Sequence, residues 1–506
     1  KAAEHVFSQQ TVQSQADSLG RSFIAAGDPM FDDQYVKGIQ GVTPQQVRQV
    51  MRKYFRPERE NLVMIEPIGS GDALDTSDVT ESAESPVIRK KLKNGLTVLI
   101  KRHAAVPIVS MQAFVKGGML SDSNENSGRA ALSSRLMARG TEKYTGDQIA
   151  QYFDSIGGSL DTNSQRNTSF LQCQVLKDDF ETAFGYAHQV LFKPTFPEGE
   201  FKKAQQLQLG RIAQRQANPQ AEILDFFASL LPKANPFGRT VLGTQETVSN
   251  LTVDDCRDFH KRFFVPANMV LAIYGDIDPK ETLQMVEKTF GKQPAGADSL
   301  PSYPKQHSMP RDIRARLDTR RENTAMVLIG FPTCNVFDPK TRAALEIVST
   351  VLTGGRGAGG RLFNELRGAR LVYYVFGYQL TGLPPGYFLF MAQTRPETVD
   401  EVVKRIRAGV DKIRTEGIPG DEFQRAKEKL ITGHAMSNTT SSSQAFQAAL
   451  DELYGLGHDY DRSFDERINA TTIDEVKEVL NRHFKAAYIV TSSPKSAEKT
   501  ATAPER

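Results

Sequence analysis

Three segments of the chain share one pattern of apolar and polar positions. They are TPQQVRQVMRKYF from Thr43, TVDDCRDFHKRFF from Thr252 and TIDEVKEVLNRHF from Thr472. Each segment places apolar residues at helical spacing behind a threonine, with Gln, Asp or Glu three residues later, as in a capping box. A short run of strand-forming residues follows each one. The pattern therefore predicts the same helix-then-strand element three times.

The spacing of these segments indicates a large internal repeat. The second segment begins 209 residues after the first, and the third begins 220 residues after the second. A unit of about 210 residues is the size of one domain. Because the first copy ends near residue 66, we interpret residues 1–66 as the C-terminal end of a preceding domain. The chain would then be the later part of a longer protein.

Composition divides the rest of the chain into two domains. Residues 67–87 carry five acidic residues and no basic ones, which predicts an extended, solvated linker. Residues 294–310 hold four prolines and are interpreted as a second linker. The domains are therefore expected at 88–293 and 311–490, and residues 491–506 are expected to form a disordered tail.

Both expected domains mix strand and helix patterns. In the first, Asn94-Gly95 predicts a hairpin turn, and helical spacing predicts a long helix at about 198–216. Further helices are expected near 127–138, 145–156, 178–191, 341–355 and 360–368, and strands near 108–118, 158–175, 324–331 and 372–394. This order predicts an α+β fold of tandem two-layer sandwich domains, each with a mostly antiparallel sheet and helices on one face.

The bulk composition excludes several functions. The chain of 506 residues has a net charge of +3, so no large basic surface is expected for nucleic acid. No apolar run approaches the roughly 18 residues of a membrane span. Cys173, Cys256 and Cys334 lie far apart, which fits neither a zinc ribbon nor a redox pair. Partners are therefore expected to be recognised at local sites.

Several motifs occur in an order that is specific to one protein family. LKNGLTVLIKR is followed by a strand, then by GGMLSDSNENSGRAALSSRLMARGT, and later by PFGRTVLGTQETVSNLTVDDCRDFHKRFFVPANMVLAIYGDID. This order resembles the pitrilysin/insulinase family of zinc metallopeptidases over residues 88–490. The end of a third family domain would correspond to residues 1–66.

The resemblance places a zinc motif on the first long helix of the first domain. Active members carry His-x-x-Glu-His there, with two histidines that ligate zinc and a glutamate that activates water. The flanking Gly128 and Gly140 match the family pattern, but the ligand positions hold Ala131 and Arg135, and the base position holds Ser134. Alanine has no ligand atom, and arginine would repel a dication. None of the three residues can perform the family's chemistry.

The third family ligand is a glutamate about 75 residues further on, which corresponds to a position near Gly210. The segment FKKAQQLQLGRIAQRQANPQA, which surrounds this position, contains no Asp or Glu. The eight histidines never occur as a close pair, and lone ones such as His260 and His483 are interpreted as structural. We therefore expect no metal in this chain and no catalytic residue.

The second domain carries two further motifs. GGRGAGG at 354–360 contains a G-x-G-x-x-G spacing, but it follows a helix and not a strand, so it is interpreted as a helix connection. The resemblance places a substrate-handling glycine-rich loop at this point. It also implies that Arg367 and Tyr374 contact peptide substrate, because both side chains can donate hydrogen bonds to an oxygen. Tyr373 would take this role if the alignment slips by one residue.

The resemblance implies a function for a chain that lacks its own zinc. The chain would be the non-catalytic C-terminal half of a zinc metallopeptidase, which forms the chamber wall and binds unfolded peptide. Hydrolysis would occur at zinc in a missing N-terminal half or in a homologous active subunit, and none is expected from this chain alone. The alternative is a catalytically dead scaffold or peptide-binding subunit. The sequence itself does not indicate a cellular compartment, and the resemblance suggests the bacterial periplasm.

Overall fold

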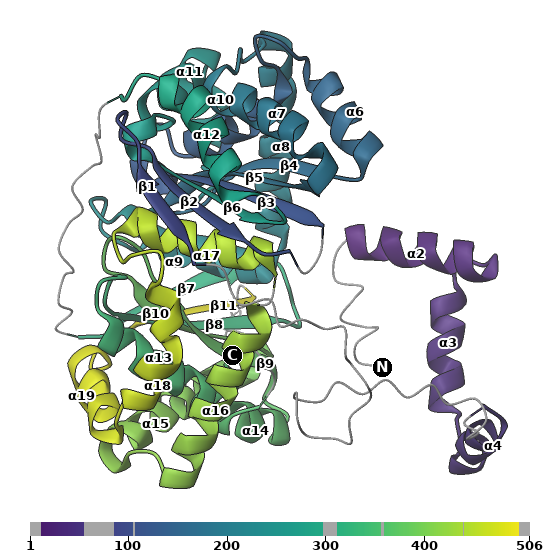
Figure 1. Cartoon of the computed structure of the whole chain (residues 1–506). Helices are drawn as coiled ribbons and strands as arrows, with labels where there is room; N and C mark the ends of the chain where they lie inside the picture. The colour runs from purple at the N-terminus through teal and green to yellow at the C-terminus, as the bar shows by residue number, and fades with distance from the viewer. Residues whose placement is uncertain are drawn as a thin grey trace, which may run out of the picture. The chain divides into compact units, whose positions relative to one another are not determined.

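A computed structural model describes residues 12–54, 86–104, 107–296, 311–355, 359–438 and 440–494. The chain divides into two compact units, Lys1–Glu81 and Ser82–Arg506, each of which is described by itself (Figure 1). Most of the linkers predicted at 67–87 and 294–310 lies outside the described residues. The same holds for residues 495–506 of the predicted tail.

The described part of the first unit consists of the helices α2 (Val12–Ala26), α3 (Phe31–Gln40) and α4 (Pro44–Tyr54). Helix α4 is the first copy of the repeated segment, and its capping box forms. Thr43 N–H donates to Gln46 Oε1 at 2.8 Å, and Gln46 N–H donates to Thr43 Oγ1 at 3.3 Å. Phe23, Ile24 and Met51 are exposed. The strand expected after α4 lies outside the described residues.

The first half of the second unit contains a sheet with the strand order β1-β2-β6-β3-β5-β4. Only β2 and β6 run parallel. Gly95 has a φ of 90° in the turn between β1 and β2, where Asn94-Gly95 predicted a hairpin. The strands are β1 (Ile88–Lys91), β2 (Thr97–Arg102), β3 (Ile108–Lys116), β4 (Ser159–Ser164), β5 (Thr168–Leu176) and β6 (Met269–Gly275).

Helices of the same half cover one face of this sheet and form its main hydrophobic core (Figure 1). Phe259 and Phe263 of α11 and Phe290 are among the largest side chains buried there. The helices of this half are α5 (Arg129–Leu136), α6 (Gly146–Ile156), α7 (Phe180–Phe192), α8 (Glu198–Ala217), α9 (Pro219–Ser229), α10 (Gln245–Asn250), α11 (Val253–Phe263) and α12 (Pro279–Thr289).

The second half repeats this plan with a sheet of order β7-β11-β8-β10-β9, in which only β7 and β11 run parallel. Its strands are β7 (Ile313–Thr319), β8 (Ala325–Pro332), β9 (Val372–Leu380), β10 (Tyr387–Thr394) and β11 (Tyr488–Pro494). Its helices are α13 (Pro339–Thr353), α14 (Arg361–Gly368), α15 (Val399–Glu416), α16 (Gly420–Ser437), α17 (Ser441–Tyr454), α18 (Phe464–Ala470) and α19 (Ile473–His483). Residues 491–494, which we assigned to the tail, complete β11 because they pair with β7.

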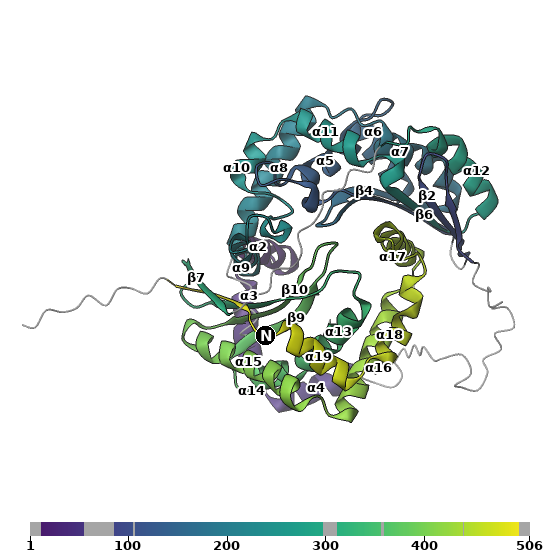
Figure 2. The same ribbon diagram turned by 90° about the vertical axis from the view of Figure 1, so that its left-hand side faces the viewer.

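Two helices pack on the sheet of the opposite half. Helix α9 of the first half packs on β8 and β11, and α17 of the second half packs on β3 and β6 (Figure 2). Phe227 of α9 lies 5.3 Å from the ring of Tyr387 and 5.5 Å from the ring of Tyr488. Phe446 of α17 contacts Phe114 edge to face at 4.9 Å. Each sheet therefore has its own helices on one face and a helix from the other half on the second face.

The other two copies of the repeated segment are α11 and α19. Thr252 and Thr472 accept the N–H groups of Asp255 and Glu475, and those carboxylates accept the threonine N–H groups. Strands β6 and β11, which both lie inside their sheets, follow directly. The capping pattern therefore marks the helix that precedes an inner strand of each sheet.

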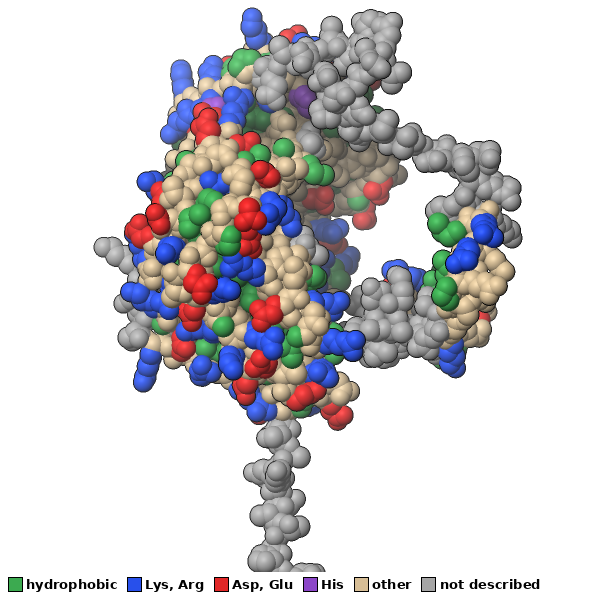
Figure 3. Space-filling model, turned by 90° about the horizontal axis from the view of Figure 1, so that it is seen from below, with side chains coloured by type: hydrophobic (Ala, Val, Ile, Leu, Met, Phe, Trp, Pro, Cys, Tyr) green, Lys and Arg blue, Asp and Glu red, His purple; other side chains and the backbone are tan. Residues whose placement is uncertain are grey.

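Charged residues are distributed without a dominant sign. On the face of the second half that Figure 3 presents, basic and acidic side chains are interspersed. Among the described residues, no helix is both long and apolar enough to cross a membrane.

Candidate functional site

Helix α5 carries the three positions that the zinc motif would occupy, and its N-terminus is held by a buried carboxylate. Gly128 N–H and Ala130 N–H donate to the two oxygens of Asp122 at 3.0 and 3.2 Å. Gly128 has a φ of 95°, and a Cβ there would lie 2.5 Å from the Leu242 carbonyl oxygen. Glycine is therefore required at the start of this helix.

The electrostatics of Asp122 are dominated by burial. Burial raises the pKa of its carboxyl group to about 7, although Arg129 and the N–H groups of Ala130 and Gly128 act to lower it. The Arg129 Nε lies 3.6 Å from Asp122 Oδ1. The helix thus starts on an acid whose protonation changes near neutral pH.

The zinc-motif positions on α5 hold no metal ligand. Ala131 and Ser134 are buried, and Arg135 is half-buried. In the part of the chain that the structure describes, no group of three His, Cys, Asp or Glu residues could hold a metal ion. The site therefore cannot supply the carboxylate and imidazole donors that zinc prefers.

The third ligand position lies on α8, which packs against α5. Gly210 is exposed, and no heavy atom lies within 4 Å of a Cβ built on it. The positive charge of its neighbour Arg211 on α8 affects the pKa of Arg135 on α5. Burial first, and the positive charge of Arg211 second, lower the pKa of the Arg135 guanidinium. A basic side chain in a positive electrostatic environment therefore occupies a position where a dication would be expected.

The two histidines that we interpreted as structural are held by backbone. His260 Nε2 lies 2.9 Å from the Leu191 carbonyl oxygen, and burial lowers the pKa of this histidine to about 4. His483 Nδ1 lies 3.2 Å from the Pro332 carbonyl oxygen, and burial lowers its pKa as well. Both rings are neutral packing residues at physiological pH.

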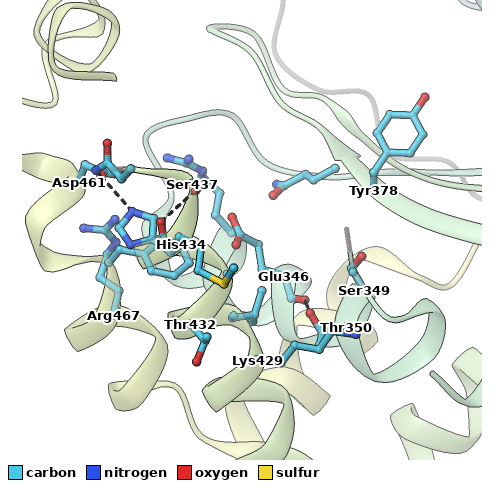
Figure 4. A pocket seen from close by; sticks show the side chains of 18 of the residues that line it. Glu346, Ser349, Thr350, Tyr378, Lys429, Thr432, His434, Ser437, Asp461 and Arg467 are labelled. Atoms are coloured by element: carbon cyan, nitrogen blue, oxygen red, sulfur yellow. Dashed lines mark hydrogen bonds and ion pairs between the residues drawn. The ribbon is translucent and has the colours of Figure 1, made fainter. Parts of the chain in front are cut away.

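A cavity of about 1750 Å³ lies in the second half, between α13, α16, α17 and the edge strand β9 (Figure 4). This volume exceeds the range of roughly 300–1,000 Å³ that is typical of small-molecule sites. Hydroxyl, amide, aromatic and charged side chains of both signs line it. They include Glu346, Ser349, Thr350, Phe376, Tyr378, Lys429, Thr432, Met436, Ser437, Ser442, Phe446 and Gln447.

His434 is fixed at one side of the cavity. Its Nε2 lies 2.9 Å from Asp461 Oδ2, and its ring stacks on Phe464 at 4.1 Å (Figure 4). The Ser437 hydroxyl donates to the His434 carbonyl oxygen at 2.9 Å and not to the ring. The ring is therefore engaged by a carboxylate and an aromatic face, and Ser437 is not placed as a nucleophile beside a base.

The exposed edge of β9 is closed at its centre. The Ser349 hydroxyl donates to the Gly377 carbonyl oxygen at 2.6 Å, and Gly377 N–H donates to Thr353 Oγ1 at 3.0 Å. Both hydroxyls come from α13. A peptide therefore cannot add to β9 as a further strand at this point. Phe376 and Tyr378, whose rings stack at 5.8 Å, still line the cavity beside this edge.

The structure does not bond Arg367 to Tyr374, and neither residue lines the cavity. Arg367 is exposed on α14 and donates to the Val372 carbonyl oxygen at 3.5 Å. Tyr374 is half-buried in the same apolar cluster as α9, its hydroxyl lies 3.8 Å from Met326 Sδ, and burial raises its pKa. Tyr373 also lies half-buried on β9. From the glycine-rich segment, Gly354 and Gly355 line the cavity.

Two sequence profiles cover most of residues 82–506. The profile described as insulinase (peptidase family M16) matches residues 97–245. The profile described as peptidase M16 inactive domain matches residues 250–430. The chain belongs to the M16 peptidase family. Its family resemblance over residues 88–490 is confirmed, as is the α+β fold with two mostly antiparallel sheets.

Curated relatives of this M16 chain are bacterial. It is 27% identical over 421 residues to an uncharacterized zinc protease of Mycobacterium leprae. The aligned region covers 82% of this chain and 93% of the relative. It is 22% identical over 406 residues to the uncharacterized zinc protease YmxG of Bacillus subtilis, which covers 79% of this chain and 96% of the relative. The two halves thus correspond to nearly the full length of each relative.

Solved structures share the fold of this M16 chain. A peptidase M16 inactive domain from Pseudomonas fluorescens superposes with a TM-score of 0.75 at 22% identity, covering 82% of this chain and 99% of that chain. A protease from Helicobacter pylori superposes with a TM-score of 0.75 at 19% identity, covering 81% and 100%. These structures extend the likeness to the arrangement of both halves.

Sequence reasoning did not find the cavity or the electrostatic effect of Arg211 on Arg135. The cavity is built from elements far apart in the sequence, so no local motif signals it. Arg211 could have been found, because it is adjacent to Gly210 at the expected third-ligand position.

Proposed function

We propose that this chain is a non-catalytic M16 component that binds unfolded peptide for hydrolysis at the zinc site of an M16 partner. One observation carries this proposal: Ala131, Ser134 and Arg135 replace all three functional residues of the motif on a helix that is otherwise intact. Loss of all three groups removes both the metal and the base. The chain alone would therefore not hydrolyse peptides.

The size and lining of the cavity support peptide binding. An extended peptide exposes one N–H and one C=O per residue, and these groups require hydrogen-bonding partners when they are desolvated. The Thr432 hydroxyl, the hydroxyl hydrogen of Ser442 and the side-chain carbonyl oxygen of Gln447 can provide such partners. Phe376 and Phe446 offer apolar surface to side chains. This mixed lining suits many peptide sequences and not one small ligand.

The partner would be an M16 chain or half that retains His-x-x-Glu-His. Relatives named zinc proteases align with both halves of this chain, so a zinc-bearing homologue of the same length is a suitable partner. The two together would enclose the peptide, and residues 82–506 would form one wall of the chamber. Arg367 is exposed and is the member of the Arg367/Tyr374 pair that could reach peptide or partner without rearrangement.

Peptide binding is tested on the full chain with a fluorescently labelled, unfolded 20-residue peptide by anisotropy. Gly433 lines the cavity, and no atom lies within 4 Å of a Cβ there, so the side chain of Gly433→Trp starts in open space and its ring narrows the cavity. We expect this variant to weaken peptide binding at least tenfold. Gly185→Trp is the matched control, because Gly185 is equally open on α7 and outside the cavity.

Hydrolysis is tested in the same preparation with a quenched fluorogenic peptide and added zinc. We expect no cleavage by this chain, and cleavage when an M16 chain with the intact motif, from the same genome, is added. Stoichiometric zinc and turnover by this chain alone would contradict the non-catalytic assignment. Equal binding by both tryptophan variants would exclude the cavity as the peptide site. A partner whose rate does not change on addition of this chain would favour the scaffold alternative.

A further inference from the structure

The edge strand β9 carries three aromatic rings in a row on one face. Tyr374, Phe376 and Tyr378 are every second residue of the strand, so their side chains point to the same side of the sheet. The ring of Phe376 stacks on that of Tyr374 at 5.6 Å and on that of Tyr378 at 5.8 Å. All three rings pack against the apolar cluster to which α9 contributes. Their positions are therefore held by the sheet and by one another.

Two of these rings belong to the cavity. Phe376 and Tyr378 line it and are only half-buried, whereas Tyr374 lies outside it. Tyr378 lies apart from the charged group of His434 and Asp461 (Figure 4). The aromatic pair of Phe376 and Tyr378 therefore offers apolar surface to a ligand, at a distance from the charged side of the cavity.

The backbone of β9 beside the aromatic pair is already satisfied. Gly377 separates the two aromatic residues, and its C=O and N–H bond the hydroxyls of Ser349 and Thr353. In an antiparallel pair, both backbone groups of one residue point to one edge, and those of the next residue point to the other edge. The backbone groups of Phe376 and Tyr378 therefore point toward β10. A peptide at this place can be recognised through side-chain contacts and not through strand addition.

The spacing of the two rings matches the side-chain period of an extended peptide. Such a peptide rises about 3.3 Å per residue and its side chains alternate, so side chains i and i+2 lie on one side, roughly 6.6 Å apart. The centroids of Phe376 and Tyr378 are 5.8 Å apart. Two apolar side chains at i and i+2 can therefore contact one ring each. Side chains at i and i+1, or at i and i+3, point to opposite sides.

We propose that Phe376 and Tyr378 select peptides that carry apolar side chains at positions i and i+2. This inference names the substrate class of the cavity, and it rests on the proposed function, in which unfolded peptide binds there. Alternation of apolar and polar residues is typical of half-buried strands. The apolar side chains of such a segment are buried in a folded protein and accessible in an unfolded one. The aromatic pair therefore recognises unfolded segments with a strand pattern.

The experiment exploits the absence of tryptophan from the sequence of this chain. Three 12-residue peptides of one composition carry one Trp and one Phe among Gly, Ser and Gln, with Phe at i+1, i+2 or i+3 from Trp. Both termini are blocked. Trp anisotropy with the full chain gives the affinity, and the emission maximum reports the surroundings of the Trp ring. We expect the i+2 peptide to bind about tenfold more tightly than the other two, with a blue shift, because it alone contacts both rings.

The double variant Phe376→Thr, Tyr378→Thr removes both rings and keeps residues that suit a strand. We expect it to bind all three peptides equally, with the affinity that the wild type has for the weaker ones. The matched control is Tyr144→Ala, Tyr186→Ala. It removes another half-buried pair of stacked rings, 4.2 Å apart and outside the cavity, and should keep the preference. Circular dichroism confirms that each variant is folded.

The outcomes separate this inference from the proposed function. A preference for i+2 that persists in the folded double variant Phe376→Thr, Tyr378→Thr would overturn the inference. Equal binding of the three peptides by the wild type would overturn it whatever the stability of the variants, and the proposed function would stand if Gly433→Trp still weakens binding. A preference for i+2 in a chain that does not raise hydrolysis by the M16 partner supports the inference and contradicts the proposed role in hydrolysis. If none of the peptides binds, both are wrong.

Discussion

The buried carboxyl group of Asp122 predicts a pH dependence of stability that can be separated from the rest of the protein. In the folded chain the pKa rises from an ordinary 3.8 to about 7. Between these values the folded state keeps a proton that the unfolded chain has released. The contribution of Asp122 to the free energy of unfolding is therefore fully present below about pH 4 and is lost as the pH rises through about 7.

The magnitude follows from the same two values. One pKa unit corresponds to about 1.4 kcal/mol. The raised pKa of Asp122 therefore changes the free energy of unfolding by at most about 4 kcal/mol. The side chain is fully buried, so solvent screening does not reduce this figure. For a domain of 150–250 residues, 1 kcal/mol shifts the melting temperature by roughly 2–4 °C, and for the larger unit of residues 82–506 by roughly half as much. The expected effect is thus about 6 °C.

The perturbation is Asp122→Asn, which keeps the size of the side chain and removes the charge. Melting temperatures of both proteins are measured between pH 4.5 and 8 by circular dichroism. We expect the variant to gain stability over the wild type as the pH rises, with most of the change between pH 5 and 7.5. The control is Asp258→Asn, because Asp258 is exposed on α11 and should follow the wild-type curve.

One result would refute this reasoning. If Asp122→Asn is less stable by the same amount at every pH, the carboxyl group is ionised throughout. The N–H bonds from Gly128 and Ala130 would then outweigh the cost of burial. Asp122 would act as an ordinary helix cap, worth about 1 kcal/mol.

Three further predictions concern packing and reactivity. Phe227→Ala should cost about 3–5 kcal/mol, because this buried ring joins α9 to the sheet of the other half, and urea unfolding should show it. Thr472→Ala should cost about 1 kcal/mol in the same assay, and Thr472→Ser should restore most of it. Burial raises the pKa of Cys173, Cys256 and Cys334 to about 12, so Ellman's reagent at pH 8 should label three thiols only after unfolding, and fast labelling of the folded chain would contradict this.

The elements that sequence reasoning found are those with local signals. The capping boxes at Thr43, Thr252 and Thr472 depend on residues three positions apart, so they could be recognised directly. The turn at Asn94-Gly95 is likewise encoded by two neighbouring residues. Such signals also gave the order of strands and helices in both halves.

The features that sequence reasoning missed depend on distant residues. The packing of helices α9 and α17 on the sheet of the opposite half was not predicted. The apolar face of a helix can be read from the sequence, but the surface against which it packs cannot. Residues 491–494 were predicted to be disordered, because they pair with residues of β7 that lie 175 positions earlier in the chain. The zinc motif could be read as lost from three residues, whereas the repulsion between Arg135 and Arg211 needed the packing of α5 on α8.

The exchange of α9 and α17 has a mechanical consequence. Each sheet is covered on one face by a helix from the opposite half of residues 82–506. The two halves therefore cannot separate unless Phe227 and Phe446 lose their contacts. We expect residues 82–506 to move as a single rigid body. Under the proposed function, an opening that admits peptide would then occur between this unit and its partner, and separating the two halves would expose the apolar faces that α9 and α17 cover.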